Sequence, residues 1–169
     1  SALYSIISNP ALAGSGSGFF SALVQHLSDA QQTNQIRLEK SPEEIARTIT
    51  QRMAAMVVDA SAGETPPVLI QLAQVAGLSK DQQKLFLQKY LEAGSLWSKV
   101  LSNDGVEGPP PIDNTMLVTL NHTLQMGMAT YNNVPLVKAL RTKKNILEAR
   151  EMAQLDEAGW VQLMASNNI

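Results

Sequence analysis

The residues best suited to chemistry in this 169-residue chain are its two histidines, His26 and His122, because the chain contains no cysteine. A metal site needs several ligands at short spacing, such as a second histidine or a carboxylate one helical turn away. His26 has only Asp29 one turn further on, and His122 has neutral amide and hydroxyl neighbours. We therefore interpret both as surface histidines or as histidines satisfied by hydrogen bonds, and we expect no metal site.

Other catalytic patterns are equally sparse. The Gly/Ser alternation at 14–18 precedes no Lys-Ser/Thr pair and follows no clear strand, so it predicts neither a phosphate loop nor a nucleophile elbow. The adjacent carboxylates Glu43-Glu44 and Asp156-Glu157 fall at expected helix starts, where negative charge offsets the helix dipole. We expect no catalytic residue and no cofactor, so the sequence predicts a protein that is not an enzyme.

Composition narrows the function classes further. Thirteen basic residues face 15 acidic ones, for a net charge of −2, which argues against a nucleic-acid partner that needs a basic face. One local basic cluster exists, but it falls at the end of a short predicted helix, where cations suit the dipole. The cluster comprises Lys138, Arg141, Lys143 and Lys144.

No apolar run approaches the roughly 20 residues of a membrane span.

The seven methionines fall mostly on apolar helical stripes or beside them. We expect them to fill the core, because the flexible thioether side chain fits irregular gaps. A methionine-rich groove for a partner helix is the alternative. They are Met53, Met56, Met116, Met126, Met128, Met152 and Met164.

Start and stop signals for helices recur along the chain. They predict an all-α fold, an irregular bundle of about eight helices. The Gly/Ser stretch at 14–18 is predicted to be a flexible joint, so residues 1–18 form an N-terminal segment ahead of a single helical domain at 19–169. A first helix ends near Asp29, and an amphipathic helix spans roughly 42–59. Gly77 is the expected left-handed stop of the next helix.

Capping residues mark several of these helix starts. Ser41 and Ser79 each begin a capping-box pattern, in which a serine and a Glu or Gln three residues later exchange hydrogen bonds. Asp113, Asn133 and Asp156 are predicted N-caps of the later helices.

The most specific pattern lies near the C-terminus, in the stretches TLNHTLQMG (119–127), NNVPLVKAL (132–140) and MAQLDEAGWVQLM (152–164). It resembles the helical module of the large A-components of Tc (ABC-type) insecticidal toxin complexes and their relatives with a neuraminidase-like region. The likeness extends upstream through LSKDQQKLFL and covers roughly residues 78–164. Residues 1–77 match that module only in being helical.

Packing within this stretch can also be predicted from the residues themselves. Leu136, Val137 and Leu140 are expected to pack on the face formed by Leu120 and Leu124. Trp160 is expected to be the largest apolar anchor of the closing helices.

The resemblance implies a structural role. In Tc toxins the A-component is the receptor-binding and pore-forming subunit, and its helical modules belong to a shell around the translocation channel. The family supplies no catalytic residues at these positions, so none carry over. The implied partners are other domains or subunits of a large assembly, with homo-oligomerisation also open. The chain would then be an excised domain of a protein that is secreted or at the cell surface.

Two alternatives stay open from the sequence. A free-standing helical adaptor or structural assembly protein, located in the cytoplasm, would have the same composition and helical pattern. A small α-helical hydrolase using His26 or His122 is the least favoured, because neither histidine has a catalytic neighbourhood.

Overall fold

The computed structural model describes residues 13–60, 66–93 and 96–169. These residues form eight α-helices and one 3₁₀ helix, with no strand among them, which confirms the predicted all-α fold. The helices in chain order are α2 (Ala13–Gln32), α3 (Pro42–Ala60), α4 (Val68–Ala76), α5 (Lys80–Ala93), α6 (Trp97–Val100), α7 (Asn114–Ala129), α8 (Val134–Lys143), the 3₁₀ helix η2 (Ala149–Gln154) and α9 (Glu157–Ser166).

The predicted caps are present at the helix starts. At α5 the capping box is complete: the backbone N–H of Gln82 donates to Ser79 Oγ at 3.2 Å, and the N–H of Ser79 donates to Gln82 Oε1 at 2.9 Å. The Glu44 N–H donates to Ser41 Oγ at 3.2 Å at the start of α3. Gly77 ends α4 in the left-handed conformation, with φ of +100°.

The later helices begin in the same way. The carboxylate of Asp113 accepts from the Met116 N–H at 2.8 Å, and that of Asp156 accepts from the Gly159 N–H at 2.7 Å. The Asn133 side chain accepts from the N–H of Leu136, at 3.2 Å. These local bonds set where α7, α8 and α9 start.

The prediction for the N-terminal part of the chain is wrong in two respects. Helix α2 begins at Ala13, so Gly14–Gly18 are helical in backbone rather than a flexible joint, and α2 continues to Gln32 rather than ending near Asp29. Glycine costs about 1 kcal/mol inside a helix, but once a helix is nucleated each added residue gains a backbone hydrogen bond. Residues 1–12 of the predicted segment lie outside the described part, as do the predicted helix boundaries at 61–65 and at Gly94.

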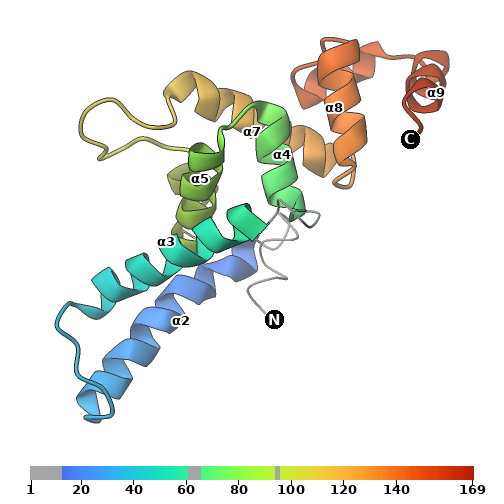
Figure 1. The fold of residues 1–169 in the computed structure, drawn as a ribbon. Helices are drawn as coiled ribbons and strands as arrows, with labels where there is room; N and C mark the ends of the chain where they lie inside the picture. The colour runs from blue at the N-terminus through green and yellow to red at the C-terminus, as the bar shows by residue number, and fades with distance from the viewer. Residues whose placement is uncertain (1–12, 61–65, 94–95) are drawn as a thin grey trace.

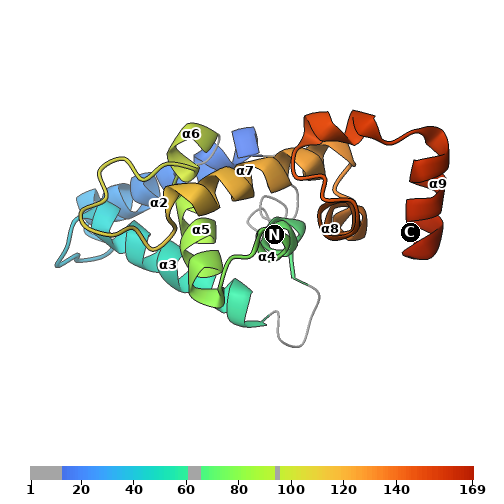
Figure 2. The same ribbon diagram turned by 90° about the horizontal axis from the view of Figure 1, so that it is seen from above.

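The described helices form an elongated body (Figures 1 and 2). At one end α2 and α3 lie side by side and run in opposite directions, and α5 packs against both. In the middle, α4 contacts α5, α7 and α8. At the other end, η2 contacts α7, and α9 packs on α8.

The short helix α4 is the centre of the core. Leu69, Ile70, Leu72 and Ala73 are fully buried, so the helix is covered on several sides. Such burial requires a helix that is apolar nearly all round, and α4 has no charged residue. The surrounding helices add their buried residues to the same apolar cluster, among them Phe86, Leu87, Tyr90, Leu91, Leu120, Leu124, Met126, Leu136, Val137 and Leu140.

Helices α4 and α7 approach closely at Gly127. A Cβ atom placed on this glycine would lie 2.7 Å from Leu72 Cδ1. Carbon atoms do not pack at that distance, so the absence of a side chain at Gly127 lets the Leu72 side chain fill the interface.

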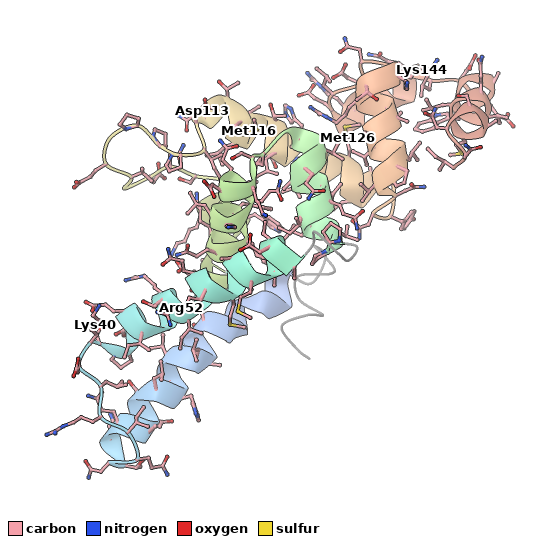
Figure 3. The ribbon with its side chains drawn as sticks, viewed as in Figure 1. Lys40, Arg52, Asp113, Met116, Met126 and Lys144 are labelled. Carbon is pink, nitrogen blue, oxygen red and sulfur yellow. The ribbon has the colours of Figure 1, made fainter. Side chains whose placement is uncertain are left out.

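The methionine and tryptophan predictions hold only in part. Met126 is fully buried as expected, whereas the side chains of Met56 and Met128 are 69% and 55% exposed. Trp160 is half-buried at the edge of the core, because α9 presents only Leu163 as a fully buried residue. Figure 3 shows Met126 close to α4, with Asp113 and Met116 toward the opposite end of α7.

Candidate functional site

The side chain of His122 contacts a carboxylate that is distant in the sequence. Its Nε2 atom lies 3.0 Å from Oε1 of Glu148, and the other oxygen of Glu148 accepts from Arg150 Nε at 2.8 Å. The His122 and Glu148 side chains are each about a quarter exposed, whereas that of Arg150 is 83% exposed. Glu148 is thus a hydrogen-bonding partner of His122 that sequence reasoning missed.

The remaining candidates for chemistry are dispersed. His26 is exposed on α2. Glu43 and Glu44 occupy the first turn of α3, and Asp156 caps α9, as their positions predicted. Within the described ranges 13–60, 66–93 and 96–169, no three histidine or carboxylate side chains form a group that could hold a metal ion.

Of the four residues of the basic cluster on α8, one is held by the protein and three are exposed. Arg141 Nη1 donates to the Leu147 carbonyl at 3.0 Å, and burial lowers the pKa of this guanidinium. Lys138, Lys143 and Lys144 are exposed. Lys144 lies at the end of α8, far from Arg52 on α3, so the cluster does not join the basic residues of α3 (Figure 3).

An aromatic pair links α5 to α6. The ring centres of Tyr90 and Trp97 are 5.4 Å apart with the planes tilted by 43°. Tyr90 is fully buried, and this burial raises the pKa of its hydroxyl to about 12. Offset aromatic contacts of this kind stabilise packing, so the pair has a structural role.

Large apolar side chains are exposed at and beside the turn between α7 and α8. Tyr131 is 96% exposed and Met128 is 55% exposed. Pro135 is also exposed, at the first turn of α8. We call these three residues the α7–α8 turn surface. A tyrosine this exposed gains nothing from core packing, and tyrosine is enriched at the centres of protein interfaces.

The backbone of this turn is strained as well as exposed. Tyr131 and Asn132 have φ of +55° and +62°, the left-handed region that L-residues rarely adopt. The Asn132 N–H donates to the Gly127 carbonyl at 2.7 Å, which closes the end of α7. Strain at exposed turns is held by surrounding structure and is concentrated at binding sites.

Comparisons with protein-family models, with curated protein sequences and with solved structures find no match for this chain. Among the described residues, none of the helices has the length and apolar character needed to cross a bilayer.

Proposed function

We propose that this chain is a non-enzymatic structural and interaction module of a large, secreted, Tc-like toxin A-component, within the helical shell of its pore-forming translocation subunit. The observation that carries the proposal is the pattern over residues 119–164, which resembles the module of that family. Its three stretches correspond to α7, the start of α8, and the run from η2 into α9. On this proposal the chain is part of a longer polypeptide that lies outside the cell or at its surface.

The packing of these helices supports a structural role. Asn133 and Asp156 cap α8 and α9 inside the quoted stretches, and α4 joins α7 and α8 into one apolar core. Several polar residues of this region take part in helix caps, and His122 contacts Glu148. This use of polar groups suits a packed block that holds other parts of an assembly.

The α7–α8 turn surface is the contact point that we assign to a neighbouring domain or subunit. Tyr131 and Met128 offer apolar area with one hydroxyl group, the combination typical of interface anchors. The short turn is held by the bond from the Asn132 N–H to the Gly127 carbonyl, so its backbone has little conformational freedom to lose on binding.

An immunoblot of the source organism with an antibody against this chain tests the proposal. We expect the antibody to detect a secreted or surface polypeptide far larger than the 18.3 kDa of this chain. A cytoplasmic band near 18.3 kDa would instead support a free-standing helical adaptor and would contradict the toxin-module proposal.

A second experiment addresses the contact surface within the longer protein. Tyr131→Ala should lower the yield of assembled particles on size-exclusion chromatography, because it removes the exposed anchor. Lys143→Ala, also an exposed residue, is the matched control and should assemble normally. Equal assembly of both variants and the parent would exclude the α7–α8 turn surface as the contact point.

A further inference from the structure

A partly open cavity lies between α2, α3, α5 and α6, outside the stretch on which the proposed function rests. Its volume is about 600 Å³, within the range of roughly 300–1,000 Å³ that is common for small-molecule sites. The residues that line it and matter here are Phe20, Arg47, Lys89, Glu92, Leu96 and Lys99.

The charge of this cavity is unbalanced. Arg47, Lys89 and Lys99 contribute three cations, against the single carboxylate of Glu92. Oε1 of Glu92 accepts from two neutral donors, Thr50 Oγ1 and Gln88 Nε2, each at 3.1 Å. None of the three cations forms an ion pair with another residue of the part of the chain that the structure describes.

Lys89 is the least exposed of these three cations. It is half-buried, and its Nζ atom donates to the Ser102 carbonyl at 2.6 Å, which leaves two of its three N–H groups for other acceptors. Burial lowers the pKa of this ammonium group, because the charged form loses contact with water. An anion in the cavity would supply the missing charge.

Apolar side chains occupy other parts of the wall. Phe20 of α2 is half-buried, as is Ala93 at the end of α5, and Leu96, just before α6, is 48% exposed. An inorganic ion alone would leave these groups in contact with water. A molecule with an apolar body would cover them and gain from their burial.

We propose that this cavity binds a small organic anion, whose charged group contacts Lys89, Arg47 and Lys99 and whose apolar body contacts Phe20 and Leu96. A smaller pocket of about 260 Å³ beside Lys143 and Lys144 lacks a half-buried cation. The larger cavity is therefore the better candidate for an anion site, and Lys143 beside the smaller pocket provides a control position.

Isothermal titration calorimetry of the full chain with phenyl phosphate at low ionic strength tests this site. We expect saturable binding to one site that is weakened about tenfold in Lys89→Met and severalfold in Lys99→Met. Lys99 is exposed and can be changed without disturbing the fold, so this variant keeps the test valid if Lys89→Met unfolds. Absence of phenyl phosphate binding to the parent protein would overturn the proposal.

Two comparisons distinguish specific binding in this cavity from non-specific electrostatic attraction. Lys143→Met removes the same charge outside the cavity and should bind phenyl phosphate as the parent does. Inorganic phosphate should bind at least about fivefold more weakly than phenyl phosphate, because it lacks the apolar body. Equal weakening by Lys143→Met and Lys99→Met, or equal affinity for the two phosphates, would contradict the proposed site.

Discussion

His122 on α7 and Glu148, immediately before η2, are joined by a contact of 3.0 Å between Nε2 and Oε1. This contact ties the segment after α8 back onto α7, which is also contacted by α8 and by η2. The two side chains keep about a quarter of their surface exposed, which places the contact at the edge of the core.

A double-mutant cycle should detect this interaction. His122→Ala, Glu148→Ala and the double variant are expected to show a coupling of about 0.5–1.5 kcal/mol in the free energy of unfolding, the usual net value of a partly buried polar contact. Urea denaturation followed by circular dichroism gives the four free energies.

Arg150→Ala provides the control for this cycle. The Arg150 side chain is 83% exposed, so its pairing with the other oxygen of Glu148 should contribute close to nothing. A coupling between His122 and Glu148 that is no larger than that between Arg150 and Glu148 would show that the His122 contact does not stabilise the fold.

Gly127→Ala should destabilise the protein although alanine favours helices. The added Cβ would lie 2.7 Å from Leu72 Cδ1, and Leu72 is fully buried, so the side chain has little room to move. Overpacking of this kind costs about 1–3 kcal/mol, against a gain of about 1 kcal/mol in helix propensity. We expect a net loss of up to about 2 kcal/mol, measured by urea denaturation.

Shortening the opposing side chain tests the cause of that loss. Leu72→Val makes room beside Gly127, so the Leu72→Val/Gly127→Ala double variant should be more stable than the sum of the two single effects predicts. If the two effects simply add, the close approach of α4 and α7 is not what restricts Gly127 to glycine.

The helix starts could be predicted from the sequence because their determinants are local. The Ser79 box and the Asp113, Asn133 and Asp156 caps each join residues three positions apart, so the spacing alone identifies them. The same reasoning was wrong for Gly14–Gly18, where composition suggested a joint and the helix extends through it.

The contacts between distant segments could not be predicted in this way. The pairing of Glu148 with His122, the bond from Lys89 to the Ser102 carbonyl and the fit of Leu72 against Gly127 arise only when helices pack. Periodicity shows that a helix has an apolar face but does not show which neighbour covers it. The cavity, where α3, α5 and α6 bring Arg47, Lys89 and Lys99 together, therefore had no signal in the sequence.

Tyr90 predicts a specific loss of stability at alkaline pH. Burial raises the pKa of its hydroxyl from 10.0 to about 12, so the folded state favours the neutral phenol. This contribution is fully present below pH 10 and is lost as the pH rises through about 12. From about pH 9 to about pH 11 the parent should lose roughly 1 kcal/mol more than Tyr90→Phe, measured by urea denaturation at each pH. Identical pH dependence in the two proteins would contradict the assigned cause.

Replacing Tyr131 by glycine should raise stability, unlike most substitutions in a folded protein. The side chain is 96% exposed, so its loss removes little packing, while φ of +55° imposes strain that glycine does not feel. The left-handed backbone costs other residues about 1–2 kcal/mol, and the greater freedom of glycine in the unfolded chain offsets part of that gain. Tyr131→Ala removes the same ring but keeps the strain, so Tyr131→Gly should be the more stable of the two by about 0.5–1 kcal/mol in urea denaturation. If alanine is as stable as glycine here, the turn does not store the strain that its backbone angles indicate, and Tyr131 would be held there without cost to folding.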